Sequence, residues 1–97
     1  MTRDEMVSFI QQLGIDEIDI LKKKNADYAG DDPDPFRNFR MFGPFGILVR
    51  MSDKLARLRT FAERGQFVIE EEGVRDTVND LRNYAGLFLA MVSEKKS

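Results

Sequence analysis

The chain has 97 residues, of which 42% are apolar and 33% are charged, and its formal net charge is -2. This composition predicts one globular domain, residues 1–97, with a core small enough that we expect a homo-oligomer. The small net charge disfavours binding to a nucleic acid polymer or to an anionic membrane. The chain has no cysteine and no histidine, so any metal must be held by oxygen ligands, which favours magnesium or manganese.

The hydropathy pattern predicts a soluble, cytoplasmic protein. Residues 1–5 contain no apolar signal-peptide core. No stretch approaches the roughly eighteen consecutive apolar residues of a membrane-spanning helix.

A short first helix is predicted at the N-terminus. Thr2 and Glu5 have the spacing of a capping box and precede an apolar run. We expect this helix to continue to about Leu13 and to end at Gly14.

A second helix is predicted after Gly14, with Asp16 as its N-cap. Three of its apolar or aromatic residues share one face with Asn25, which is the polar member of that stripe; they are Ile18, Leu21 and Tyr28. The helix ends in a run of an ammonium, a carboxamide, a carboxylate and a phenol. These groups belong to Lys24, Asn25, Asp27 and Tyr28. Such a run at a helix end predicts a polar ligand site, and the ligand it suggests is a nucleotide.

A long ordered loop is predicted at about residues 30–44, because phenylalanines within it would dock it onto the core. Phe36 and Phe39 have two interpretations. They pack the loop onto the core, or they stack on a base while Arg37 neutralises a phosphate.

Two longer helices complete the all-α, compact four-helix, antiparallel bundle that we expect. The third runs from about Phe45 to Glu63 and stops at Gly65. The fourth runs from near Glu70 to about Ser93, after a connector at residues 66–69. The apolar seam of the third helix is predicted to be Ile47, Met51, Leu55, Leu58 and Ala62. That of the fourth helix is Val74, Val78, Leu81, Ala85, Phe88 and Val92.

Asp76, Asp80 and Asn83 lie on one strip of the fourth helix. The strip continues into Leu87 and Met91, so we expect it to face another element or subunit. Neighbouring carboxylates repel each other unless a cation lies between them, which makes Asp76 and Asp80 candidate magnesium ligands. The alternative is that nearby lysines and arginines neutralise them as ordinary ion pairs.

The third helix carries a polar strip with Arg50, Asp53, Lys54 and Arg57. One interpretation is an ordinary salt bridge between Asp53 and Arg57. The other is that Asp53 supplies a further metal carboxylate while the cations contact phosphate oxygens.

Four blocks of sequence follow one another in a recognisable order: Lys24-Asn25-x-Asp27-Tyr28, Phe36-Arg37, Ser52-Asp53-Lys54-x-x-Arg57-Leu58 and Val74-x-Asp76-Thr77-x-x-Asp80-Leu81-x-Asn83-Tyr84. Over about residues 20–92 the chain resembles the first type of nucleotide-modification-associated domain, formerly a domain of unknown function and common in phages. That family is related in outline to the all-α nucleoside triphosphate pyrophosphohydrolases typified by MazG and the dimeric dUTPases.

The resemblance implies a helical oligomer that holds magnesium over a nucleotide phosphate chain, in the host cytoplasm if a phage encodes it. Carried over by position, Asp53, Asp76 and Asp80 would be metal ligands. The nucleotide pocket would be lined by Lys24, Asn25, Asp27 and Tyr28. The chain departs from the pyrophosphohydrolases, which use a denser run of glutamates. It also places Ala29 before Gly30, where the family has a glycine directly after the tyrosine.

Two functions of different class follow. The first is a magnesium-dependent pyrophosphohydrolase that acts on free or modified nucleotides. The second is a protein that sequesters a nucleotide or a cyclic-nucleotide immune signal without cleaving it. An adaptor with no small ligand is a third possibility, against which the polar Asn25 on an apolar face argues.

Overall fold

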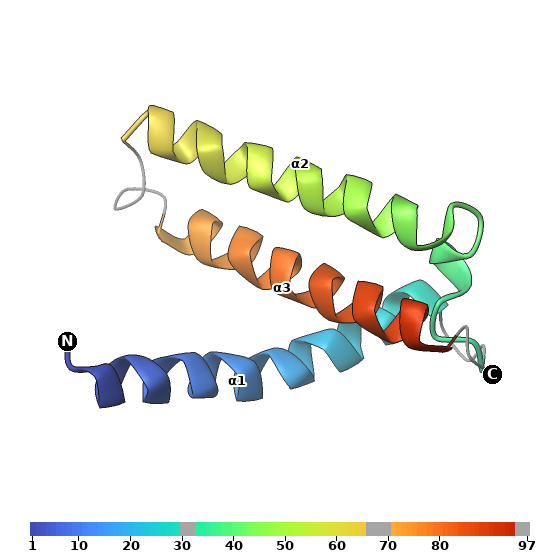
Figure 1. The fold of residues 1–97 in the computed structure, drawn as a ribbon, viewed down its shortest axis with the longest axis horizontal. Helices are drawn as coiled ribbons and strands as arrows, with labels where there is room; N and C mark the ends of the chain where they lie inside the picture. Colours follow the sequence, from blue (N-terminus) through green and yellow to red (C-terminus); the bar gives the residue numbers. More distant parts are fainter. Residues whose placement is uncertain (30–32, 66–70, 95–97) are drawn as a thin grey trace. The chain divides into compact units, whose positions relative to one another are not determined.

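The computed structural model describes residues 1–29, 33–65 and 71–94, without the side chains of residues 26–29 and 71. Within these residues it contains three α-helices and no strand (Figure 1). The helices are α1 (Arg3–Ala29), α2 (Gly43–Glu63) and α3 (Glu71–Glu94), and a 3₁₀ helix, η1 (Arg37–Phe39), precedes α2. The prediction of an all-α protein is confirmed. The chain comprises two compact units, Met1–Arg37 and Asn38–Ser97.

The start of α1 has the predicted capping box. The backbone N–H of Glu5 donates to Thr2 Oγ1 at 3.1 Å, and the N–H of Thr2 donates to Glu5 Oε1 at 3.3 Å. Two backbone donors at the helix start are thereby satisfied, which fixes where the helix begins.

The prediction of two separate N-terminal helices is wrong, because α1 runs without a break through Gly14. Asp16 does not cap a second helix. Its Oδ1 accepts a hydrogen bond from Gln12 Nε2 at 2.9 Å, one turn earlier on the same helix. Among the described residues, positive φ occurs at Gly43 and Gly65 and not at Gly14. A glycine with helical dihedral angles weakens a helix by about 1 kcal/mol relative to alanine but does not end it, so three helices form instead of four.

The predicted end of α2 is confirmed. Gly65 has φ +64°, and its N–H donates to the Ala62 carbonyl at 3.1 Å. The N–H of Arg64 donates to the Thr60 carbonyl, also at 3.1 Å. A glycine in the left-handed conformation commonly ends a helix in this way. At the other end α2 begins at Gly43, two residues before the predicted start, with Pro44 in its first turn.

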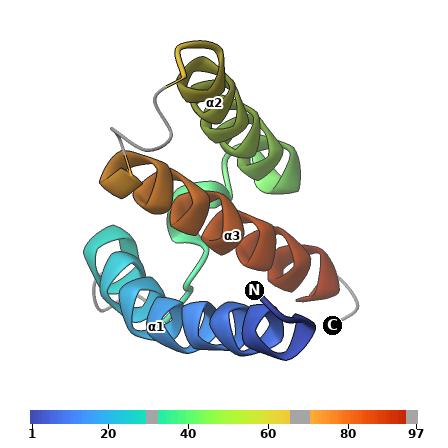
Figure 2. The ribbon, with the colours of Figure 1, turned by 90° about the vertical axis from the view of Figure 1, so that its left-hand side faces the viewer.

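The helices α2 and α3 run antiparallel and lie side by side in both views (Figures 1 and 2). Ile47 of α2 is fully buried, and Met91 of α3 is 4% exposed. The predicted seam of α3 is half-buried throughout its length. Thr77, beside that seam, is also buried, and its hydroxyl donates to the Gly73 carbonyl at 2.7 Å.

The predicted seam of α2 is correct in its first half and drifts in its second half. Met51 and Leu58 are half-buried, but Leu55 is 54% exposed and Ala62 is also exposed. At 100° per residue Leu55 lies about 80° around the helix from Ile47, whereas Lys54 lies only about 20° from it. Lys54 therefore takes the seam position that the sequence analysis assigned to leucine.

The predicted connector at residues 66–69 lies outside the described residues, as does Gly30–Asp32 of the predicted loop. In the parts of the chain that the structure describes, no helix is long and apolar enough to cross a membrane.

Two glycine-to-alanine substitutions test this description of the helices. A Cβ added at Gly86 in α3 meets no atom within 4 Å, so Gly86→Ala should raise the free energy of unfolding by about 0.5–1 kcal/mol. Gly65→Ala should lower it by about 1 kcal/mol, because alanine disfavours the positive φ at the end of α2. Urea denaturation of both variants measures the difference. Equal effects of the two substitutions would contradict the assigned conformations.

Candidate functional site

The predicted ligand residues at the end of α1 belong to the first compact unit. Asn25 Nδ2 donates to the Pro35 carbonyl at 2.8 Å, so this carboxamide ties the end of α1 to the following loop. Lys24 is half-buried. The side chains of Asp27 and Tyr28 lie outside the described residues. The nucleotide-binding role of these four residues stays a prediction, and Asn25 has a structural role in addition.

The loop after α1 is organised by Asp34. Its Oδ1 accepts a hydrogen bond from the Phe36 N–H at 3.0 Å, and its carbonyl accepts one from the Arg37 N–H at 3.3 Å. This is the side-chain turn that aspartate commonly forms with the backbone two residues later. Phe36 is 8% exposed, and Arg37 is exposed. The packing interpretation of Phe36 is therefore confirmed.

Phe39 packs in the second compact unit, where it is 8% exposed. Its ring lies edge-on to the ring of Tyr84 in α3, with centroids 6.4 Å apart and an interplanar angle of 84°. Aromatic pairs favour this geometry. The contact attaches η1 to α3, so Phe39 also follows the packing interpretation.

A polar contact between α2 and α3 joins Lys54 and Asp80. Lys54 Nζ lies 3.1 Å from Asp80 Oδ2, and the two side chains are only 26% and 22% exposed. Both residues were candidate site residues, and the structure brings them together. The contact is of the kind that the ion-pair interpretation of Asp80 expects, and its partial burial makes it stronger than an ordinary surface salt bridge.

Asn83 lies three residues after Asp80 on α3 and is 8% exposed. Its Nδ2 is buried and has no hydrogen-bond partner among the described residues. A buried, unsatisfied amide nitrogen costs about 1–3 kcal/mol, so its presence calls for an explanation. Lys54, Asp80 and Asn83 form what we call the polar cluster of the helix pair. It offers an ammonium, a carboxylate and an amide donor.

Two cations extend the polar cluster along α2. Arg50 and Arg57 are exposed and lie one turn on either side of Lys54. Each lies within about 60° of Lys54 around the helix axis. The Arg57 guanidinium also lies over the ring of Phe61, 5.8 Å from its centroid. The three cations therefore form a row along one side of α2.

The structure also places the other two predicted metal ligands. Asp53 and Asp76 are exposed, on α2 and α3 respectively. In the described residues no group of three acidic side chains is placed to hold a metal ion. A magnesium site made by Asp53, Asp76 and Asp80 stays a prediction, and it would require magnesium to compete with Lys54 for Asp80.

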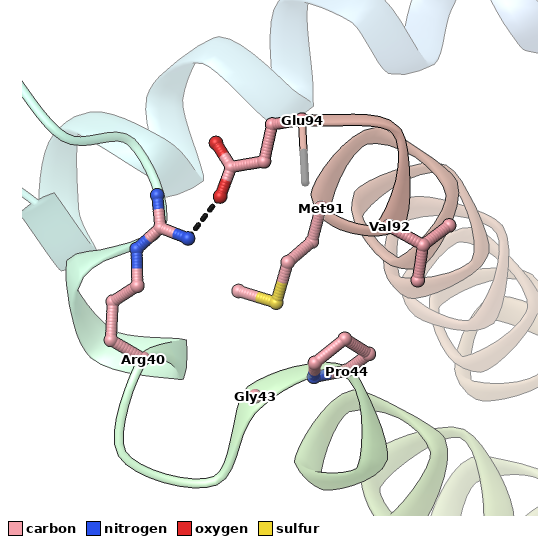
Figure 3. Close-up of a pocket in the computed structure, with 6 residues that line it drawn as sticks. All are labelled: Arg40, Gly43, Pro44, Met91, Val92 and Glu94. Carbon is pink, nitrogen blue, oxygen red and sulfur yellow. Dashed lines mark hydrogen bonds and ion pairs between the residues drawn. The ribbon is translucent and has the colours of Figure 1, made fainter. Parts of the chain in front are cut away.

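The sequence analysis missed a hollow at the end of the helix pair (Figure 3). Its volume is about 330 Å³. The lining residues are Arg40, Gly43, Pro44, Met91, Val92 and Glu94. Arg40 forms an ion pair with Glu94. The sequence signals for this hollow are the Gly-Pro start of α2 and the apolar end of α3. The hydrophobic periodicity of each helix does not show that these two helix ends lie against each other.

Comparison of the chain with protein-family models, curated proteins and solved structures found no match. The functional argument therefore rests on the residues themselves.

A double-mutant cycle tests the Lys54–Asp80 contact. Lys54→Met and Asp80→Asn should each lower the free energy of unfolding by about 1–2 kcal/mol, because each leaves a shielded partner uncompensated. The double variant should recover about 1 kcal/mol of the summed loss. Asp53→Asn and Asp76→Asn serve as controls and should change the free energy by less than about 0.5 kcal/mol, since both side chains are exposed. If the two single losses of unfolding free energy add up to the loss in the double variant, Lys54 and Asp80 have no coupling energy.

Proposed function

We propose that this chain is a nucleotide-binding protein and that the polar cluster Lys54, Asp80 and Asn83 contacts the bound nucleotide. The observation that carries the proposal is the buried Asn83 amide, which has no partner among the described residues. Such a group is explained when a bound molecule or a water accepts its hydrogen bond. A base carbonyl or a phosphate oxygen is an acceptor of the required kind.

The charges around the polar cluster fit a phosphate-bearing ligand. Arg50, Lys54 and Arg57 follow one another at intervals of four and three residues along α2. Successive cations are therefore separated by about 5 Å along the helix axis, so a chain of phosphates could contact more than one of them. The Asp80 carboxylate accepts hydrogen bonds and suits a ribose hydroxyl or a base N–H. The row of cations distinguishes a nucleotide from an uncharged nucleoside.

Binding without cleavage is the form of this function that we favour. Magnesium-dependent hydrolysis needs carboxylates that gather around a metal and activate a water. Asp80 instead contacts Lys54, and Asp53 and Asp76 are exposed. A protein that holds a nucleotide or a cyclic nucleotide intact needs no such cluster of carboxylates. Hydrolysis is the second candidate, and the Asp76-x-x-x-Asp80 spacing with its family resemblance favours it.

One substitution separates a ligand-binding role of Asn83 from a structural one. Asn83→Leu keeps the volume similar and removes the buried amide, so the ligand-free chain should unfold at the same temperature or higher. The same variant should lose the rise in unfolding temperature that the best nucleotide of a panel gives the wild type. A structural asparagine would behave in the opposite way, with lower stability and an unchanged response to nucleotide.

The panel is run with magnesium and with a chelator, and the ligand is recovered by chromatography after denaturation. A stabilisation that does not need metal, with intact ligand recovered, is the expected result. Products that form only with magnesium, and that do not form with Asp76→Asn or Asp80→Asn, would show that the protein hydrolyses the nucleotide instead of only binding it. If no mono-, di-, tri- or cyclic nucleotide stabilises the wild type, the proposed function is wrong.

A further inference from the structure

Two arginines lie on one line of α2, on either side of Lys54. Arg50 precedes Lys54 by four residues and Arg57 follows it by three, so the two arginines are about 20° apart around the helix axis and roughly 10 Å apart along it. Both are exposed, and among the described residues neither forms an ion pair with a carboxylate. The two differ in one respect, because an aromatic ring holds the guanidinium of Arg57.

The ring belongs to Phe61, which lies one turn after Arg57. The guanidinium carbon is 5.8 Å from the ring centroid, within the range of a cation–π interaction. Phe61 is half-buried, so packing fixes the ring while the charge stays at the surface. Asp53 lies one turn before Arg57, but no ion pair joins these two described residues. An arginine held by a ring rather than by a carboxylate keeps its N–H donors available for an anion.

The antiparallel alignment of α2 and α3 places Asn83 and Arg57 on opposite sides of the ion pair that joins the helices (Figure 1). Arg57 lies about 4.5 Å beyond Lys54 along α2, toward the start of α3. Asn83 lies about 4.5 Å beyond Asp80 along α3, toward the start of α2. About 9 Å of the helix pair therefore separates the buried amide from Arg57. Arg50 lies on the same side of the ion pair as Asn83.

We propose that a nucleotide lies along the helix pair with its base at the Asn83 end and its phosphates at the Arg57 end, where Phe61 positions the guanidinium. This inference rests on the proposed function and adds a direction to it. A direction matters because it assigns each part of the ligand to a different side chain, and each assignment is tested separately.

The order of the side chains matches the order of groups in a nucleotide. At one end the buried amide of Asn83 donates to an acceptor on the edge of the base. In the middle Asp80 accepts from a ribose hydroxyl, and Lys54 beside it contacts the first phosphate. At the other end Arg57 contacts the following phosphates, because a guanidinium offers two parallel donors that match phosphate oxygens.

Burial and charge disfavour the reverse orientation. Asn83 is 8% exposed, so phosphates at that end would lose much of their hydration, whereas a neutral base would not. Phosphates at that end would also depend on Arg50, for which the described residues offer no ring contact. Arg57 is exposed and held in position, so it binds an anion with less loss of hydration and of side-chain freedom.

Matched arginine substitutions test the orientation by isothermal titration calorimetry of the full chain. The probes are ATP, GTP, CTP and UTP, each compared with its nucleoside. Arg57→Gln should weaken binding of the best triphosphate by about tenfold or more, as loss of a hydrogen bond between charged groups does. Arg50→Gln removes the same charge from the same line of α2 and should weaken it by about twofold or less, because only a screened attraction is lost. Neither substitution should change nucleoside affinity.

Phe61→Leu and Phe61→Tyr separate the positioning of Arg57 from packing. Leucine keeps an apolar side chain but removes the ring, so Phe61→Leu should lower triphosphate affinity by about threefold and leave nucleoside affinity unchanged. Tyrosine keeps the ring, so Phe61→Tyr should retain the triphosphate affinity of the wild type. A packing role alone would lower the unfolding temperature of Phe61→Leu without changing the ratio of the two affinities.

The wild type is the control for the proposed function. If it binds no triphosphate and no nucleoside, the proposed function fails and the orientation fails with it. If triphosphates bind the wild type but Arg50→Gln weakens them as much as Arg57→Gln or more, the orientation is overturned while the proposed function stands. An unchanged ratio of triphosphate to nucleoside affinity in Phe61→Leu overturns the role of Phe61.

Discussion

An ion pair joins the two helices of the pair, because Lys54 of α2 lies 3.1 Å from Asp80 of α3. Lys54 occupies a seam position that an apolar residue would normally take, and its charge is acceptable there because Asp80 opposes it. A contact of this kind contributes to the packing of α2 against α3, because either charge without the other would be shielded and uncompensated.

The ion pair also determines what the neighbouring residues can do. Asp80, one of the three carboxylates that the sequence offers as metal ligands, lies beside an ammonium and contributes to the contact between α2 and α3. Asn83, one turn further along α3, is buried by the same packing, and its amide nitrogen has no partner in the described part of the chain. In the proposed function, Lys54 and Asp80 support the fold as well as the ligand, and Asn83 donates to the ligand alone.

The sequence predicts the bounds of α2 and α3 to within two residues, and the end of α2 has a local signal, the left-handed Gly65. The prediction fails at Gly14, because a glycine with helical dihedral angles weakens a helix without ending it. The prediction also fails at Leu55. This residue was assigned to the seam because it is apolar, although the helical rotation of 100° per residue turns it away from the seam. The Lys54–Asp80 contact was one of several possible pairings, and only the packing of two helices selects it.

We infer that Lys54, rather than a metal ion, is the partner of Asp80. Nitrogen-15 NMR of the Lys54 ammonium measures this directly, because an ammonium held in an ion pair exchanges its protons slowly enough to be observed. We predict that the Lys54 signal persists when magnesium is added, both without and with the nucleotide that stabilises the chain. Loss of the signal on addition of magnesium, with recovery in chelator, would show that the metal displaces Lys54 and would contradict the account.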